Sequence, residues 1–260
     1  MIDIHNHILP NLDDGSPHHE VTDYYLDRIA DANMTAVIFT PHFMRGFYGN
    51  KKDRILDEYK KALKFIEIKG YTFSTYCAAE VYLVGSDIVN DIQENSFMIN
   101  GSRYVLVENS MTGFSMDFYE NLFNLVKLGF KPILAHPERY LEIKENPDLA
   151  EDFMYRDVYL QINTGSILGE YGSRVKDVAM ELIERGYVHF LGSDCHCKTG
   201  MYDFPKAVER IRKDFNDKTA DLIAIDYPLK MLNNEEVPYF YINKKQLPLK
   251  RNFFQRLFMK

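Results

Sequence analysis

The chain has 260 residues, of which 46% are hydrophobic and 27% are charged, the composition of an ordinary globular protein. No apolar run approaches the roughly 20 residues that cross a bilayer, and no signal-peptide pattern precedes the first apolar run at Ile2, so we expect a cytoplasmic protein. The net charge of −7 argues against a nucleic-acid partner, and the three cysteines (Cys77, Cys195 and Cys197) lack the spacing of a disulfide framework.

Seven nearly continuous apolar runs alternate with charged helical segments, the pattern of a parallel sheet covered by helices. In chain order they are Ile2–His5, Ala36–Thr40, Tyr71–Ala79, Arg103–Glu108, Pro132–His136, Val158–Asn163 and Val188–Ser193. This rhythm favours an α/β fold with a TIM-like barrel of seven parallel strands over an open doubly wound sheet. We expect a single domain over residues 1–260, in which residues 228–260 form a C-terminal extension.

The ends of the predicted helices carry recognisable capping residues. Four predicted helices end at a residue that suits the left-handed conformation of a helix C-terminus, namely Asn33, Gly70, Gly129 and Gly186. Ser16 and Pro17 predict a helix that has serine as its N-cap and proline at its first position.

Histidines and acids follow or end six of the seven predicted strands. His5 and His7 are two residues apart, so a strand projects both from one face. The carboxyl ends of parallel strands are where α/β barrels build active sites. The full set is His5, His7, Asp14, His42, Glu80, Glu108, His136, Asp194 and His196. Five imidazoles and four carboxylates form a ligand set for several divalent cations.

Each of these residues alone is more often a capping or surface residue than a ligand. Their joint placement is harder to explain in that way, because five of the eight histidines fall at strand ends beside acids. His18, His19 and His189 are the remainder, and we expect a solvated helix start and a strand residue there, not metal ligands.

Several segments resemble the PHP (polymerase and histidinol phosphatase) superfamily. MIDIHNHILPNLDDGS, TPHF, AAEVYL, LVEN, LAHPERY and SDCH look like its motifs, in order, from Met1 to about residue 215. They are most similar to its bacterial branch of metal-dependent protein-tyrosine phosphatases of capsule and exopolysaccharide synthesis. The resemblance implies a distorted seven-stranded barrel and three divalent metal ions, manganese first and iron or zinc as alternatives.

Carried over by position, the resemblance implies three ligand sets. The first set is His5, His7, Glu80 and Asp194, the second is Glu80, Glu108 and His136, and the third is Asp14, His42 and His196. Glu80 would therefore bridge two ions.

The resemblance also implies a catalytic, phosphate-binding role for Arg139 in the segment HPER. A guanidinium can hold two phosphate oxygens at once. The alternative is a salt bridge to Glu138 or Glu142. Relatives carry a second arginine where this chain has Met201. Lys198 or Arg45 would then supply part of the missing positive charge.

The loop after His42 offers aromatic side chains for a phenyl ring of the substrate, namely Phe47 and Tyr48 together with Phe43. Simple packing of the loop is an equally good interpretation of these residues. A phenolate leaves phosphate more readily than an alkoxide does, since its conjugate acid has a pKa of about 10. Phosphotyrosine therefore suits a site that has no obvious general acid.

Three other functions compete with a metal-dependent tyrosine phosphatase as interpretations of the sequence. A small-molecule phosphatase, such as one for histidinol phosphate, would use the same fold. A thiol phosphatase needs arginine six positions after its cysteine, but Leu83, Met201 and Asp203 stand there, which excludes that class. A non-catalytic metal-binding module that docks on a membrane kinase would not need so complete a ligand set.

The expected partner is a tyrosine-phosphorylated protein, specifically a membrane-associated tyrosine kinase. The tail NKKQLPLKRNFFQRLFMK mixes basic and aromatic residues, so contact with an anionic membrane surface is one interpretation. Packing of an amphipathic helix against the barrel is the preferred one.

Overall fold

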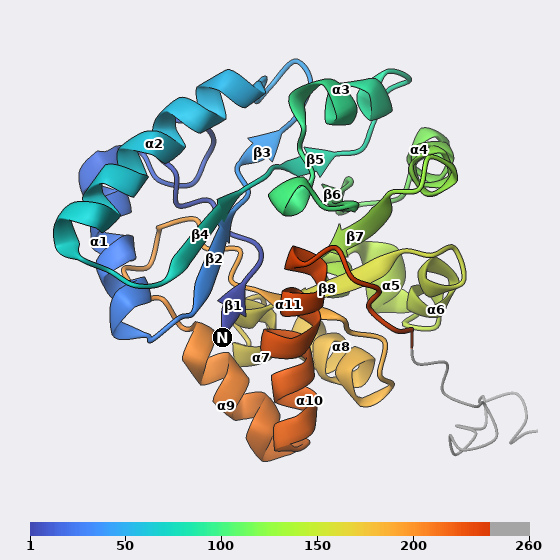
Figure 1. The fold of residues 1–260 in the computed structure, drawn as a ribbon. Coiled ribbons are helices and arrows are strands. Elements are labelled where there is room, and N and C mark those ends of the chain that lie inside the picture. Colours follow the sequence, from blue (N-terminus) through green and yellow to red (C-terminus); the bar gives the residue numbers. More distant parts are fainter. Residues whose placement is uncertain (240–260) are drawn as a thin grey trace, which may run out of the picture.

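The computed structural model describes residues 1–239, in which helices surround the strands on the outside (Figure 1). The strands are β1 (Ile2–Asp3), β2 (Ala36–Phe39), β3 (His42–Phe43), β4 (Ser74–Cys77), β5 (Glu80–Tyr82), β6 (Tyr104–Glu108), β7 (Lys131–Ala135), β8 (Tyr159–Asn163) and β9 (Phe190–Gly192). The helices are α1 (His19–Asp31), α2 (Lys52–Lys69), α3 (Ile88–Asn95), α4 (Met116–Lys127), α5 (Leu141–Glu145), α6 (Leu149–Met154), α7 (Thr164–Leu168), α8 (Ser173–Glu184), α9 (Phe204–Asp214), α10 (Asp217–Asp221) and α11 (Tyr227–Leu232). Two 3-10 helices, η1 (Ile99–Gly101) and η2 (Pro137–Arg139), and one π-helix, η3 (Leu222–Asp226), complete the helical elements of the described residues.

The paired strands are all parallel, as the apolar runs predicted. Their hydrogen bonds define two sheets, in the orders β1-β2-β4 and β3-β5-β6-β7-β8-β9. The α/β fold with a parallel sheet is therefore confirmed, whereas one continuous sheet of seven strands is not observed. After a short interruption, two of the seven predicted strand regions are followed by further strands outside the predicted bounds, β3 after Ala36–Thr40 and β5 after Tyr71–Ala79.

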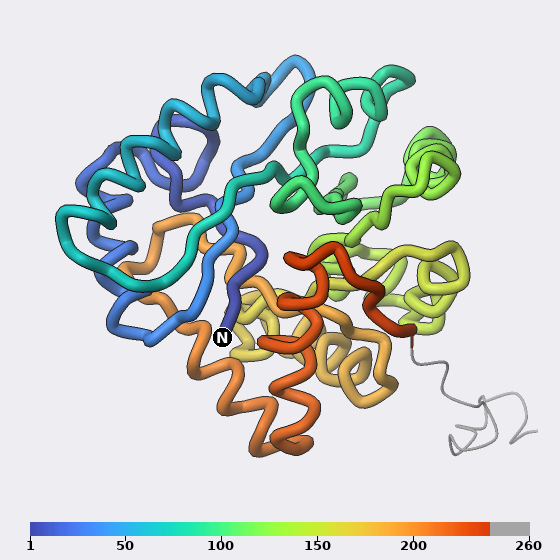
Figure 2. The backbone as a smooth tube through the Cα atoms, viewed as in Figure 1, coloured from blue at the N-terminus to red at the C-terminus, as the bar shows by residue number. Residues whose placement is uncertain are grey.

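The interruptions have a local cause and do not separate the two sheets. Pro41, between β2 and β3, has no N–H to donate to a ladder. Backbone bonds still cross here, from Ala78 N to Phe39 O at 2.9 Å and from Glu80 N to Pro41 O at 3.1 Å. At the other side, His7 N donates to Cys195 O at 3.0 Å. The strands therefore follow one curled surface, whose path is visible in Figure 2.

The helix ends test the capping predictions. All four predicted C-terminal residues have a positive φ, between 52° and 85°, as expected (Asn33, Gly70, Gly129 and Gly186). The predicted N-terminus of the first helix was wrong, because α1 begins at His19 and not at Pro17. The Ser16 hydroxyl is buried and bonds Thr22 Oγ1 at 2.9 Å instead of capping the first turn.

The amino ends of the strands are sealed by the chain that follows α11. Tyr104 and Tyr159, the first residues of β6 and β8, are fully buried. The Tyr104 hydroxyl donates to Glu235 O at 2.7 Å, and the Tyr159 hydroxyl donates to Val237 O at 3.0 Å. The predicted extension thus packs on the sheet from residue 228 to residue 239. The basic, aromatic tail NKKQLPLKRNFFQRLFMK lies outside the described residues.

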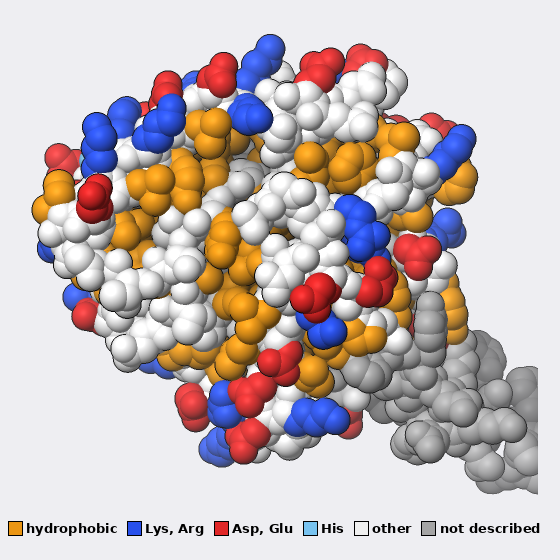
Figure 3. Space-filling view, in the orientation of Figure 1, with side chains coloured by type: hydrophobic (Ala, Val, Ile, Leu, Met, Phe, Trp, Pro, Cys, Tyr) orange, Lys and Arg blue, Asp and Glu red, His pale blue; other side chains and the backbone are white. Residues whose placement is uncertain are grey.

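The outer surface of the helices is charged. Figure 3 shows Lys and Arg side chains along α2, with hydrophobic side chains between this helix and the neighbouring strands. Within residues 1–239, no helix combines the length and the apolar character needed to cross a lipid bilayer.

His189, directly before β9, is an uncharged histidine built into the core. Its side chain is buried, Leu160 N donates to its Nδ1 at 3.2 Å, and its ring meets Tyr159 edge-on at 4.9 Å between centroids. Burial lowers the pKa of His189 to about 3. The sequence placed His189 within a strand, whereas it lies one residue before the start of β9.

We expect His189 to make the protein sensitive to acid. Below about pH 6.5 the unfolded chain binds a proton that the folded chain excludes, so stability is full above that pH and falls as the pH drops towards 3. Between pH 7 and pH 5 this group costs about 2 kcal/mol. His189→Gln should remove that part of the pH dependence in urea unfolding of the metal-free protein. An identical pH slope in the two proteins would contradict this assignment.

Candidate metal centre

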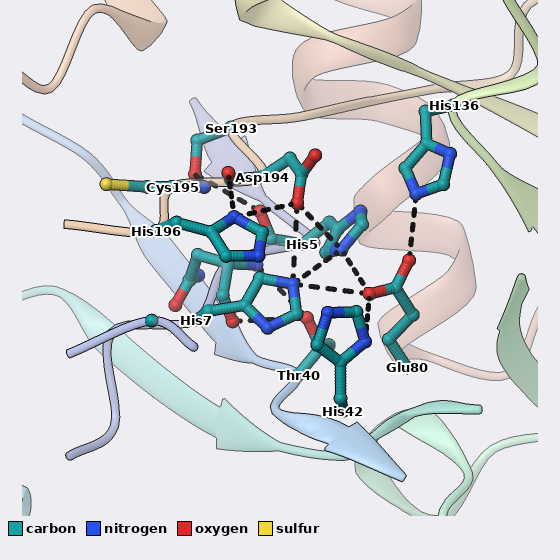
Figure 4. A network of polar contacts seen from close by, with 12 residues as sticks. His5, His7, Thr40, His42, Glu80, His136, Ser193, Asp194, Cys195 and His196 are labelled. Carbon is teal, nitrogen blue, oxygen red and sulfur yellow. Dashed lines mark hydrogen bonds and ion pairs between the residues drawn. The ribbon is translucent and has the colours of Figure 1, made fainter. Parts of the chain in front are cut away.

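The structure brings all nine predicted ligand residues together at the carboxyl ends of the strands. His5 and His7 follow β1, His42 begins β3, Glu80 begins β5, and Glu108 ends β6. His136 follows β7, Asp194 and His196 follow β9, and Asp14 lies in the loop before α1. Figure 4 shows the imidazoles pointing inward on the Glu80 carboxylate and on Asp194.

The first predicted set forms the tightest cluster. His5 Nε2 lies 3.1 Å from His7 Nε2 and 3.1 Å from Glu80 Oε2. His7 Nε2 lies 3.2 Å from the same Glu80 oxygen. Asp194 Oδ1 completes the cluster, 3.5 Å from His5 Nε2 and 3.4 Å from His7 Nε2. Ligands with bonds of about 2.0–2.2 Å to one tetrahedral ion are separated by roughly 3.3–3.6 Å, so this spacing fits a metal ion.

In the structure, His42 contacts residues of both the second and the third predicted set. His136 Nε2 lies 3.0 Å from Glu80 Oε1 and 4.0 Å from Glu108 Oε2. His42 Nδ1 approaches Glu80 Oε2 at 3.0 Å and Glu108 Oε1 at 2.9 Å, whereas its Nε2 lies 3.6 Å from Asp14 Oδ1. The same Asp14 oxygen lies 3.3 Å from His196 Nε2. His42 therefore sits between the two sets, although the sequence assigned it to the third set alone.

The imidazoles and the carboxylates of the cluster shift each other's pKa values. The pKa of His42 is lowered by burial and by His7, but Glu80 and Glu108 outweigh these effects and raise it to about 10. Burial opposes the ionised form of Glu80, yet the imidazoles of His5 and His42 hold its pKa well below the usual range. With neutral imidazoles, the four carboxylates leave a concentrated negative charge that cations would offset.

Several buried atoms of the cluster also fit a metal better than they fit hydrogen bonds. His42 Nδ1, Glu80 Oε2 and Glu108 Oε1 are buried without a properly aligned hydrogen-bond partner among residues 1–239. Such atoms are costly to bury unless something else binds them. His136 and Asp194 have φ values of 38° and 50°, a region that non-glycine residues seldom adopt and that concentrates at functional sites. The residues present therefore fit bound divalent cations.

A cavity of about 320 Å³ opens beside the cluster. Arg139 lines it, and its Nη1 donates to Asp194 Oδ2 at 2.8 Å. The guanidinium lies 4.5 Å from the centre of the Tyr171 ring. Because Arg139 pairs with Asp194, the alternative of a salt bridge to Glu138 or Glu142 is wrong. Among residues 1–239 the bond to Asp194 is the hydrogen bond that the guanidinium makes, which leaves its other N–H groups available to a ligand in the cavity.

The remaining predicted substrate residues fall into two groups. Lys198 and Met201 line the same cavity as Arg139, and Lys198 Nζ lies 3.3 Å from Asp14 Oδ2. Arg45 lies outside that lining and forms ion pairs with Asp87 and Asp91.

The two predicted aromatic residues also lie outside the cavity lining. Tyr48 stacks on His42 at 5.7 Å between ring centroids, and the Phe47 side chain is exposed. Tyr48 thus borders the metal cluster, whereas Phe47 stands in solvent at the tip of the loop.

Sequence reasoning missed the residues behind the ligands. Asp13 accepts from His7 Nδ1 at 2.8 Å and from His42 N at 2.8 Å, although only its neighbour Asp14 was singled out. Gln161 and Asn163 on β8 bond to His5 and Asp194. The signal for these two was their spacing, since they are polar residues at alternate positions of an otherwise apolar strand.

The thiols offer no alternative nucleophile. Burial raises the pKa of Cys77 to about 12. The pKa of Cys197 is also raised, by its contact with Cys195 and by burial. A protonated thiol is a poor nucleophile, in agreement with the missing cysteine motif.

Comparison with known proteins gives a consistent picture. Residues 1–233 match the family model for capsular polysaccharide synthesis, CpsB/CapC. CapC of Staphylococcus aureus is 30% identical over 202 residues, which cover 76% of this chain and 78% of CapC. The tyrosine-protein phosphatase YwqE of Bacillus subtilis is 28% identical over 240 residues, which cover 90% of this chain and 92% of YwqE.

The fold comparison agrees. A solved structure from work on YwqE of Bacillus subtilis and CpsB of Streptococcus pneumoniae, described as metal-dependent tyrosine phosphatases, matches with a TM-score of 0.85. It is 25% identical, and the match covers 92% of this chain and 97% of that chain. These matches confirm the family that the sequence motifs indicated.

The central position of Glu80 generates a prediction about metal content. Glu80→Ala removes a carboxylate that contacts His5, His7, His42 and His136, so we expect it to disturb more than one ion. Asp14→Ala removes a half-exposed contact at the edge of the cluster. Elemental analysis of the two purified variants should show less metal per chain in Glu80→Ala. Equal stoichiometry would argue against a bridging role for Glu80.

Proposed function

Because the chain belongs to the CpsB/CapC family of capsular polysaccharide synthesis, we propose that it is a metal-dependent phosphatase that hydrolyses phosphotyrosine in a protein. The observation that carries the proposal is the convergence of nine ligand-type side chains beside a cavity that contains Arg139. YwqE of Bacillus subtilis is named as a tyrosine-protein phosphatase and the matching solved structure is described as a tyrosine phosphatase, which favours this function over hydrolysis of a small phosphomonoester.

We assign the ions to the three sets described above. His5, His7, Glu80 and Asp194 hold the first, Glu80, Glu108 and His136 the second, and Asp14, His42 and His196 the third. The mixed nitrogen and oxygen ligands support manganese as the first candidate, with iron and zinc as alternatives. When bound, such ions lower the pKa of coordinated water and neutralise charge on a phosphate group.

Arg139 holds the phosphate in this proposal. Its guanidinium is fixed on one side by Asp194 and on its face by Tyr171, so little conformational entropy is lost when a ligand binds. Two free N–H groups of a guanidinium match two oxygens of a phosphate. The leaving phenolate needs less protonation than an alkoxide does, which suits a site without an obvious general acid.

The proposed partner is a tyrosine-phosphorylated kinase of capsule synthesis, membrane-associated as expected from the sequence. The family to which the chain belongs supports this choice of partner. We also propose a cytoplasmic location, because Cys77, Cys195 and Cys197 are all free.

A substrate panel tests the proposed function. The purified protein should release phosphate from a phosphotyrosine peptide much faster than from a phosphoserine peptide or from histidinol phosphate. Chelation should abolish the activity, added manganese should restore it, and iodoacetamide should leave it unchanged. Activity that survives thorough chelation but is lost on alkylation would overturn the proposal. Preference for histidinol phosphate would instead favour the small-molecule alternative.

Met201 generates a prediction about substrate affinity. It lines the cavity with Arg139 and is 53% exposed, but a thioether adds no charge and donates no hydrogen bond. A charge-assisted contact to phosphate is worth about 1.5–3 kcal/mol, or roughly 10- to 100-fold in binding. We therefore expect weak activity on small aryl phosphates with a high KM, and a severalfold lower KM in Met201→Arg.

Two further variants complete this test. Arg139→Ala should nearly abolish turnover, because it removes the remaining rigid phosphate contact. Lys198→Ala should raise KM modestly if its flexible ammonium takes part. If Met201→Arg and Lys198→Ala both leave the kinetics unchanged, the phosphate is held in another way and the role of Arg139 must be revised.

A further inference from the structure

Two buried amides on β8 connect two of the ligand residues behind the cluster. His5 Nδ1 lies 2.8 Å from Gln161 Oε1, and Gln161 Nε2 lies 2.9 Å from Asn163 Oδ1. Asn163 Nδ2 in turn lies 2.6 Å from Asp194 Oδ2. Both amide residues are fully buried, so no solvent competes for these bonds. We call His5, Gln161, Asn163 and Asp194 the amide chain.

The bonds of the amide chain all run in one direction. A histidine that binds an ion through Nε2 must carry its proton on Nδ1. His5 Nδ1–H then donates to Gln161 Oε1, so the Gln161 amide presents its NH₂ group to Asn163. Asn163 accepts with Oδ1 and donates with Nδ2 to Asp194. Each amide can satisfy both neighbours in only this orientation.

At its far end, the amide chain fixes the orientation of the Asp194 carboxylate. Its Oδ2 accepts from Asn163 Nδ2 and also from Arg139 Nη1 at 2.8 Å. Its Oδ1 remains directed at the cluster, 3.5 Å from His5 Nε2. The amide chain therefore starts at one ligand of the first set and returns to another ligand of the same set.

The packing beside His5 and Gln161 is tight. A side chain at Gly192 on β9 would place its Cβ 2.6 Å from His5 Cβ and 2.8 Å from Gln161 Nε2. Glycine at this position lets β9 approach closely enough to bring Asp194, two residues later, to Asn163. Gln161 is thus confined by the backbone at Gly192 as well as by its hydrogen bonds.

We propose that Gln161 and Asn163 are positioning residues that act as one unit, setting the tautomer of His5 and the orientation of Asp194 for metal binding. This inference rests on the proposed metal-dependent function, and it adds two residues that touch neither the ion nor the substrate. Outer hydrogen bonds of this kind typically change metal affinity by about 10- to 100-fold.

A double-mutant cycle on metal affinity tests the proposal. Gln161→Met and Asn163→Leu remove the polar atoms with little change in volume. Affinity for Co²⁺ is measured on the full chain by competition with a chelator, and the visible absorption of bound Co²⁺ reports its coordination geometry. We expect each variant to lose about 10- to 100-fold in affinity with an altered spectrum. The double variant should lose no more than that, because one break already interrupts the unit.

Control variants separate positioning from general stability. Gln93→Met repeats the substitution at an exposed site on α3, and Asn121→Leu removes a buried amide that donates to Gly85 O on the outside of the sheet. Both should keep the wild-type Co²⁺ affinity and spectrum, even where the melting temperature falls. If Gln161→Met does not fold, Asn163→Leu alone is still expected to show the loss and the altered spectrum.

The outcomes distinguish this inference from the proposed function. A wild-type chain that binds no Co²⁺ would overturn the metal centre and the amide chain together. A wild-type chain that binds Co²⁺, with unchanged affinity and spectrum in the variants, would overturn the amide chain alone. Losses that multiply in the double variant would show two independent contacts, and the claim of one unit would then be wrong.

Discussion

The Glu80 carboxylate is fully buried among imidazoles, and the centre is arranged around it. Such a group is stable inside a protein only when positive charge or several polar partners compensate it. After the break between β4 and β5, the strand pairs with β3 and gains β6 on its other side. The register then places Glu80 opposite His42, and Tyr82 opposite Glu108. The offset is the same as between β2 and β4, where Phe39 lies opposite Cys77, so the pairing of the first sheet continues across the break.

The sequence predicted the parts of the fold that depend on local patterns. Continuous apolar runs located the strands, and the positive φ at Gly70 and Gly129 followed from helices that end at glycine. The nine ligand-type residues could be selected because parallel strands bring their carboxyl ends to one edge. Composition and spacing carried this information without any knowledge of the three-dimensional register.

What the sequence could not predict depends on contacts between distant segments. The apolar runs predicted strands that end at Thr40 and Ala79, but nothing local indicated that β3 and β5 would follow or that β5 would pair with β6. Arg45 was expected near the substrate because it is a cation in a neighbouring loop, yet Asp87 and Asp91 pair with it in the fold. Gln161 looked like an ordinary strand residue, since its partner His5 is 156 residues away in the chain.

Two strands that lead to the first ligand set are among the shortest, so side chains replace part of their hydrogen-bond ladder. β1 has two residues and β9 has three. The Asp3 carboxylate, fully buried, accepts from Ser193 N at 2.8 Å, from Ser193 Oγ at 2.7 Å and from Tyr202 Oη at 2.9 Å. Burial raises the pKa of Asp3, and these donors oppose that effect by favouring the ionised form. Asp3 thus joins β1 to the segment after β9, and this link brings His5 beside Asp194 where the backbone alone provides few bonds.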